Sequence, residues 1–190
     1  MDEATYDSCT GTHGMLSRAL AGIEALQSRG DRPVLSCVVC SLNAEGLTSW
    51  VEAVAGRLPG PPAPVLHFSI TLCPEHRPEA RGVLVRYTAL GVALAEATDR
   101  ATELGLEVEP LQSSTHAAIP ACMVDRRLQG RAGPAAHPEP HEVGLEGEGR
   151  PWVKASRCRS CSATGACLGV PAAYADRFGL DELTPDRTRR

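Results

Sequence analysis

Three cysteines close together near the end of the chain constrain its folding more than any other feature. They occur in RCRSCSATGACLG, residues 157–169, with the spacing C-x2-C-x5-C and with small residues between the second and third. A tight loop of this kind can point several thiolates at one centre, as a zinc ion or an iron–sulfur cluster requires. Three thiolates are an incomplete ligand set, so a fourth ligand has to come from elsewhere in the chain.

The composition is that of an ordinary soluble protein. Of the 190 residues, 43% are hydrophobic and 22% are charged, and the net charge of −4 gives no general attraction to nucleic acid. No apolar run approaches the roughly 18 residues of a membrane span. The acidic start, Met1–Glu3, does not resemble a signal peptide. We therefore expect a cytoplasmic protein with neither a nucleic-acid partner nor a membrane partner.

The eight cysteines admit two interpretations. A secreted disulfide scaffold is one, but the chain is long, is patterned for helices and lacks an export signal. A cytosolic metal or cluster site is the interpretation that these features favour.

The first 118 residues alternate between helical and extended patterns. Residues 1–12 are polar and are expected to form turns, with Thr12 as the cap of the helix that follows. Apolar residues at a spacing of three and four predict helices, and short apolar runs predict strands buried on both faces. The expected helices are 13–28, 44–57 and 88–104, and the expected strands are 33–40, 65–70 and 106–111. This alternation predicts an α/β fold with a parallel sheet.

The pattern changes after residue 118. Residues 129–150 are rich in Gly, Pro, Glu and His without periodicity, which predicts a long flexible loop. A short strand at 151–154, the cysteine loop and a helix at 171–179 are expected to follow. We therefore divide the chain into a first region, 1–118, and a C-terminal extension, 119–190.

Several short motifs in the extension share a known context. The cysteine loop is followed by Tyr174, by Phe178-Gly179 and by a Glu-Leu-x-Pro stretch at 182–185. This arrangement resembles the auxiliary-cluster region of radical SAM proteins, closest to those with shortened SPASM-type ("twitch") extensions. In that family a further cysteine follows an Ile-Pro dipeptide after the last barrel strand, and IPACM at 119–123 matches that pattern. The resemblance implies that one auxiliary 4Fe–4S cluster is ligated by Cys122, Cys158, Cys161 and Cys167.

Upstream segments resemble the same family, so that the likeness covers nearly the whole chain. They are YDSCTGTHG at 6–14, VVCSLN at 38–43, the run 66–74, RYT at 86–88 and ELGLEV at 103–108. The resemblance implies that residues 1–118 form the last strands and helices of a partial (β/α) barrel. It also implies that Asn43, at the exit of a strand, faces the pocket for S-adenosyl-L-methionine (SAM), where it either contacts the cofactor ribose or caps the next helix.

The chain departs from the family in one respect that bears on function. The CxxxCxxC loop that binds the SAM-cleaving cluster occurs nowhere in the 190 residues, and neither does a Gly-Gly-Glu stretch. We therefore expect the C-terminal half of a radical SAM protein, which uses SAM only when the N-terminal half is supplied, for example by a partner chain. The family chemistry is SAM-derived radical modification of a peptide or small molecule, and whether this chain is itself an enzyme is left open. The alternative is a non-catalytic module, stabilised by zinc or a cluster, that binds a partner.

The other four cysteines have less context. Cys37 and Cys40 form a CxxC within an expected strand, where positions three apart face opposite sides, so we interpret both as small buried residues. Cys9 and Cys73 lie in expected loops and have no partner at metal-ligand spacing. In a barrel, Cys73 would stand just beyond the carboxyl end of a strand, where barrel enzymes do their chemistry.

Overall fold

The protein divides into two compact units. The first contains residues 1–69 and 92–109, and the second contains residues 70–91 and 110–190. The expected boundary after residue 118 falls inside the second unit, and the division into barrel and extension stays a prediction. The computed structural model describes residues 2–71, 82–111, 119–123, 125–128, 152–165, 167 and 169–186. Cys73 and the expected flexible loop at 129–150 lie outside these residues.

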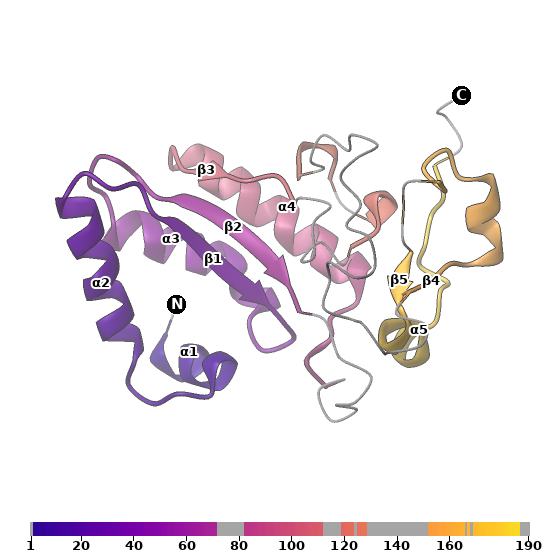
Figure 1. Ribbon diagram of the computed structural model, residues 1–190, viewed down its shortest axis with the longest axis horizontal. Coiled ribbons are helices and arrows are strands. Elements are labelled where there is room, and N and C mark those ends of the chain that lie inside the picture. Colours follow the sequence, from indigo (N-terminus) through magenta and orange to yellow (C-terminus); the bar gives the residue numbers. More distant parts are fainter. Residues whose placement is uncertain are drawn as a thin grey trace. The chain divides into compact units, whose positions relative to one another are not determined.

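The first unit is an alternating arrangement of helices around a small sheet (Figure 1). Its strands are hydrogen-bonded in the order β1-β2-β3, and β2 and β3 are parallel, with Val65 opposite Glu107. Figure 1 shows the arrows of β1 and β2 running in the same direction. The three strands do not close into a barrel within the described residues, so the partial barrel stays a prediction. The elements of this part of the chain are α1 (Glu3–Thr10), α2 (Leu16–Ser28), β1 (Val34–Val39), η1 (Ala44–Gly46), α3 (Leu47–Arg57), β2 (Val65–Ile70), α4 (Tyr87–Glu103) and β3 (Glu107–Val108).

Strand β1 is buried on one face only, and the expectation of burial on both faces is wrong for this strand. Cys37 and Val39 are buried, whereas Val34 and Val38 are 53% and 55% exposed. The alternation follows from the two-residue period of a strand, whose successive side chains point to opposite faces. Among the described residues β1 lies at the edge of the sheet, which leaves one side of its backbone unpaired, and its second face presents apolar side chains to solvent.

The N-terminal residues are helical, and the expectation of turns at 1–12 is wrong. Asp2 accepts a hydrogen bond from the Thr5 N–H at 2.8 Å, which caps the first turn of α1. Gly11, at a φ of 66°, ends the helix in the left-handed conformation that glycine adopts readily. Thr12 does not cap α2, which begins at Leu16 without a side-chain cap.

Most other expected elements are present with shifted ends. Strand β2 has its expected bounds, and α4 begins and ends one residue before the expected bounds. The expected helix at 44–57 begins as a 3-10 turn before it becomes α3. The expected strand at 106–111 shortens to the two residues of β3. Among the described residues, none of the helices is both long enough and apolar enough to cross a membrane.

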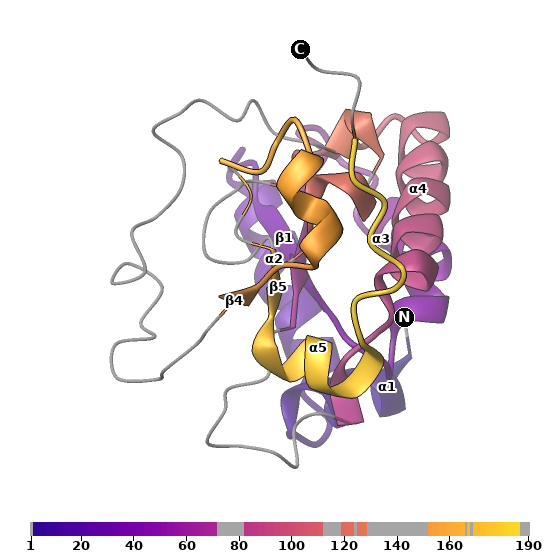
Figure 2. The ribbon, with the colours of Figure 1, turned by 90° about the vertical axis from the view of Figure 1, so that its right-hand side faces the viewer.

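The second unit contains an antiparallel pair of short strands followed by a helix (Figure 2). Strand β4 (Trp152–Val153) pairs with β5 (Val170–Pro171), so that Val153 lies opposite Val170. Helix α5 (Ala172–Phe178) begins directly after β5 and packs against both strands. The cysteine loop is therefore the connection between two paired strands. The sequence predicted β4 but not its partner β5.

A buried aromatic pair holds this unit together. The rings of Tyr87 and Tyr174 stack with their centroids 3.8 Å apart and their planes 5° from parallel. The Tyr174 hydroxyl accepts a hydrogen bond from the Tyr87 N–H at 2.8 Å and donates one to Glu182. Glu182 also accepts bonds from the Thr88 N–H and hydroxyl, at 3.0 and 2.9 Å. The Glu182 carboxylate thus satisfies the free Thr88 N–H in the first turn of α4, where negative charge is favourable, and the Tyr174 hydroxyl satisfies that of Tyr87.

Replacing Glu182 tests this network. Burial acts to raise the pKa of Glu182, but the hydrogen bonds from Tyr174 and Thr88 outweigh it and hold that pKa below its usual range. Because the folded-state pKa is lowered, the carboxylate stabilises the fold above about pH 4.3, the ordinary pKa of glutamate, and this is lost as the pH falls further. We expect Glu182→Gln to lower the free energy of unfolding by about 1 kcal/mol at neutral pH and by less in acid, measured by urea unfolding.

The control is Glu24→Gln, at an exposed position of α2. This variant is expected to unfold like the wild type at every pH. A Glu182→Gln effect that stays constant from about pH 7 to about pH 3 would contradict the role of the carboxylate charge.

Candidate metal centre

One short 3-10 turn positions two of the cysteines, one within it and one directly after it. This turn, η6 (Ser156–Ser160), carries Cys158, and Cys161 follows it directly. The Cys161 N–H donates to the Cys158 carbonyl at 3.1 Å, which closes the turn. Because a 3-10 helix has three residues per turn, side chains three positions apart lie on the same side. The spacing C-x2-C therefore places both thiols on one side of the loop.

The third cysteine returns to the same place through a second turn. The Thr164 N–H donates to the Cys161 carbonyl at 3.1 Å, and the Cys167 N–H donates to the Ala163 carbonyl at 2.9 Å. The Cys167 Sγ then accepts a hydrogen bond from the Gly169 N–H at 3.3 Å. An N–H directed at sulfur favours the thiolate, which is the form that binds metals.

Cys122 comes from a different part of the chain, the 3-10 turn η3 (Ala121–Met123). The Met123 N–H closes this turn on the Pro120 carbonyl at 2.8 Å. The turn approaches α4 so closely that a Cβ at Gly91 would lie 2.5 Å from the Met123 carbonyl oxygen. An isolated glycine inside a helix usually has a packing reason, and here it admits the turn that carries Cys122.

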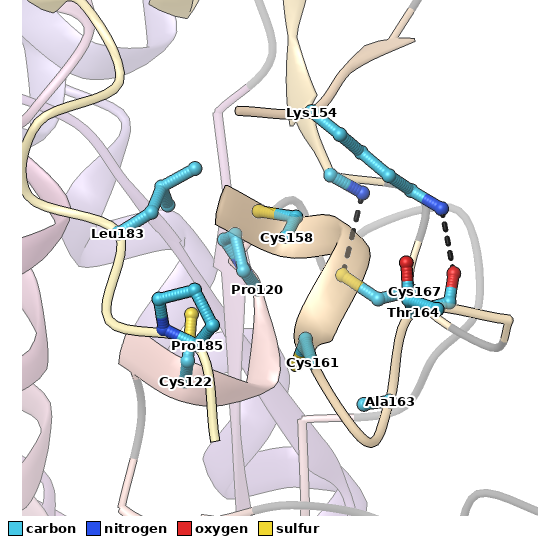
Figure 3. A pocket seen from close by; sticks show the side chains of 11 residues that line it. Pro120, Cys122, Lys154, Cys158, Cys161, Ala163, Thr164, Cys167, Leu183 and Pro185 are labelled. Atoms are coloured by element: carbon cyan, nitrogen blue, oxygen red, sulfur yellow. Dashed lines mark hydrogen bonds between the residues drawn. The ribbon is translucent and has the colours of Figure 1, made fainter. Parts of the chain in front are cut away.

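All four cysteines of the predicted ligand set line one pocket (Figure 3). The volume that the centre of a water molecule can reach in this cavity is about 30 Å³. All the empty space in the cavity, including its open mouth, amounts to about 400 Å³. Cys122, Cys158, Cys161 and Cys167 are all partly buried. The remaining lining residues are Pro120, Lys154, Ala163, Thr164, Gly169, Leu183 and Pro185.

The C-terminal segment ties the two sides of the pocket together. The Thr184 hydroxyl donates to the Cys122 carbonyl at 3.3 Å, and the Asp186 carbonyl accepts from the Ser162 N–H at 2.8 Å. Leu183 and Pro185, the residues on either side of Thr184 in the chain, both line the pocket. The Glu-Leu-x-Pro motif is therefore part of the site.

The electrostatics of the pocket favour a cation among the four sulfurs. Burial raises the pKa of Cys122, the Thr184 N–H acts against it, and the other three sulfurs add to the rise. Burial likewise raises the pKa of Cys167, while the Gly169 N–H and the Lys154 ammonium lower it and the nearby Cys158 and Cys161 raise it. Four thiolates would repel one another here, and a metal ion relieves that repulsion while holding the sulfurs deprotonated.

Four cysteine thiols are suitable metal ligands, although their sulfur atoms are not positioned for coordination of an ion in this structure. Among the described residues, no group of three or more His, Cys, Asp or Glu side chains is arranged closely enough to hold a metal as it stands. Four thiols suit zinc or an iron–sulfur cluster, which soft sulfur ligands select. The role of the four cysteines as ligands stays a prediction.

Sequence reasoning missed Lys154 in this site. Its Nζ donates to the Thr164 carbonyl at 2.7 Å, which braces the loop between Cys161 and Cys167. Lys154 directly follows β4, and only the pairing of β4 with β5 brings it to the loop. A lone lysine after a short strand carries no signal of such a role in the sequence.

Asn43 engages its side chain at the exit of β1. Its Oδ1 accepts from the Cys40 N–H at 2.8 Å, and its Nδ2 donates to the Val38 carbonyl at 2.9 Å. The side chain does not cap the following helix, so that alternative is wrong. The contact of Asn43 with SAM stays a prediction.

The remaining described cysteines gather in the first unit. Cys37 and Cys40 are 8% and 6% exposed, which confirms the interpretation as buried residues. Cys9 lies in α1 rather than a loop, and its Sγ is 3.9 Å from the Cys40 Sγ. The expectation of a loop at Cys9 is therefore wrong, and the fold brings Cys9 next to a cysteine that no metal-ligand spacing connects with it.

Comparisons with models of protein families, with curated proteins and with solved structures found no match to this chain. The pocket and its four thiols are therefore the observations on which a functional proposal has to rest.

Gly169 is the residue whose replacement tests the loop. A Cβ there would lie 2.1 Å from the Val153 carbonyl oxygen, and the φ of 97° is one that other residues rarely adopt. We expect Gly169→Ala to separate β4 from β5, to lower the free energy of unfolding by about 2–3 kcal/mol and to weaken metal binding. Urea unfolding and metal titration measure the two effects.

The matched control is Gly165→Ala in the same loop, where a Cβ meets nothing within 4 Å. It is expected to behave as the wild type. Equal stability of the two variants would show that the close contact at Gly169 does not exist in solution.

Proposed function

We propose that this chain binds an auxiliary 4Fe–4S cluster through Cys122, Cys158, Cys161 and Cys167. The observation that carries the proposal is the presence of Cys122 in the pocket of the other three, although a long stretch of chain separates it from them. The Gly169 N–H directed at Cys167 and the positive charge of Lys154 both favour thiolate ligands. A bound cluster would supply electron transfer or a binding point for a substrate.

The wider proposal is a radical SAM-type protein that modifies a peptide or small molecule. It rests on the motif resemblance, and the arrangement of the Glu-Leu-x-Pro segment beside the pocket supports it. The SAM-cleaving motif is absent from the 190 residues, so this chain does not cleave SAM by itself. The part of the protein that binds SAM has to be supplied in addition.

Anaerobic reconstitution with iron and sulfide tests the cluster. We expect a brown protein with absorbance in the sulfur-to-iron charge-transfer region and about four iron atoms per chain. Cys122→Ala, Cys158→Ala, Cys161→Ala and Cys167→Ala are each expected to lower the iron content. Cys37→Ala, at a buried cysteine of the first unit, is the control and is expected to leave the spectrum unchanged.

A second candidate function is a zinc-stabilised module that binds a partner. The small size of the pocket favours it, because about 30 Å³ is closer to the space for a single ion than to that for a four-iron cluster, although the thiols still have to move closer together. A colourless protein that retains one tightly bound zinc and takes up no iron would establish this candidate and overturn the cluster. A cluster that forms without Cys122 would contradict the proposed ligand set.

The open edge of β1 supports a partner that adds a strand. The exposed apolar side chains of Val34, Val38 and Leu42 lie on or just after this edge strand, which is the kind of surface that pairs with another strand. The proposed partner is the N-terminal part of the barrel. Without it, we expect the chain to self-associate, with an apparent mass in light scattering that rises with concentration.

Val38→Lys is expected to reduce this association, because a charge on an edge strand opposes pairing. The matched control is Val92→Lys, where the side chain is 59% exposed but belongs to helix α4 and not to the edge strand. A wild-type chain that stays monomeric, soluble and cooperatively folded at high concentration would refute the strand-adding partner.

A further inference from the structure

Two cysteines of the first unit lie close enough to react with each other. The Sγ atoms of Cys9 and Cys40 are 3.9 Å apart, although the residues are separated by 31 positions. Cys9 lies in the last turn of α1, and Cys40 is the first residue after β1. A disulfide needs the sulfurs at about 2.0 Å, so the pair is about 2 Å from bonding distance.

The two thiols differ in access. Cys9 is exposed, whereas Cys40 is 6% exposed. A reagent from solution therefore reaches Cys9 first, and Cys40 is positioned to react only with what is attached to Cys9. An exposed attacking cysteine beside a second, resolving cysteine is the arrangement of a reversible thiol switch.

Helix α1 is the element that can move to bring the Cys9 and Cys40 sulfur atoms within bonding distance. None of its residues is buried, so shifting it disturbs no packed core side chain. Cys40, in contrast, is fixed at its backbone, because its N–H donates to Asn43 Oδ1 and its carbonyl accepts from the Asn43 and Ala44 N–H groups. The closure is therefore a small approach of α1 to a stationary Cys40.

We propose that Cys9 and Cys40 form a reversible intramolecular disulfide by exchange with a small-molecule disulfide. The Cys9 thiolate attacks one sulfur of the reagent, forms a mixed disulfide and releases one thiolate. The Cys40 thiolate then attacks the Cys9 sulfur and releases the second thiolate. The two protons lost by the cysteines pass to the two released thiolates, so the protein is oxidised by two electrons and the reagent is reduced by two.

The pair reacts slowly. Burial, the neighbouring charge of Cys40 and the hydrogen bond with Cys40 raise the pKa of Cys9 to about 11, so little thiolate is present at neutral pH. The disulfide therefore forms under sustained oxidation and not in a brief exposure. Once formed, it fastens α1 to the exit of β1.

Cys37 is the competing partner for Cys9. Cys37 is three positions before Cys40 and is also buried, and burial raises its pKa to about 12, with the sulfurs of Cys9 and Cys40 adding to the rise. Position favours Cys40, because Cys40 Sγ lies within contact distance of Cys9. The experiment has to distinguish the two pairings.

The test uses the full chain, reduced, freed of metal and then incubated with oxidised glutathione at about pH 8.5, where more thiolate is present. Trypsin leaves Cys9 in the peptide 1–18 and both Cys37 and Cys40 in the peptide 30–57. We expect these peptides to be joined, with a mass about 2 Da below their sum, and to separate after reduction. The linked protein is also expected to show slower hydrogen exchange in α1.

Two variants identify the partner. Cys37→Ala is expected to retain the link, whereas Cys40→Ala is expected to lose it and to accumulate glutathione on Cys9. A link that persists in Cys40→Ala, or a wild-type chain that keeps glutathione on Cys9 without forming the link, would overturn the proposal. Circular dichroism of both variants verifies that they are folded, and neither result depends on the metal centre of the second unit.

Discussion

The second unit depends on the bonds made by the short segment that follows α5. Glu182 holds this segment to the first turn of α4, through Tyr174 and Thr88. Two residues further on, Thr184 bonds to the turn that carries Cys122, and Asp186 bonds to the loop that carries the other three cysteines. The segment therefore connects the turn that carries Cys122 with the loop that carries the other three cysteines. The placement of the four thiols around one pocket depends on it.

Short-range sequence patterns were sufficient to locate those helices and strands that depend mainly on neighbouring residues. The two-residue and three-to-four-residue periods located β2 and α4 to within one residue. The C-x2-C-x5-C spacing predicted a tight loop, and the structure has a 3-10 turn that carries Cys158 and ends just before Cys161. Cys122 is different, because no spacing connects it with Cys158. Its inclusion in the ligand set came from the motif resemblance, and the structure independently places it in the same pocket.

The features that sequence reasoning missed are long-range. Strand β5 consists of Val170 and Pro171, too short a run to be recognised without its partner β4. The approach of Cys9 to Cys40 requires α1 to fold beside the exit of β1, and the sequence of α1 has no buried face that would predict such a position. The exposure of Val34 and Val38 depends on which elements cover the second face of β1, and a local sequence pattern does not reveal this.

The pairing of β4 with β5 has a consequence for the order of events in assembly. Both ends of the cysteine loop are held by backbone hydrogen bonds and by the close contact at Gly169, none of which involves a sulfur atom. In zinc fingers, by contrast, the metal is required for the chain to fold at all. In this chain the paired strands and the contact at Gly169 hold the loop through backbone atoms alone. If the four thiols bind a metal as proposed, the scaffold could form before the metal arrives, and metal uptake would then be a step separate from folding.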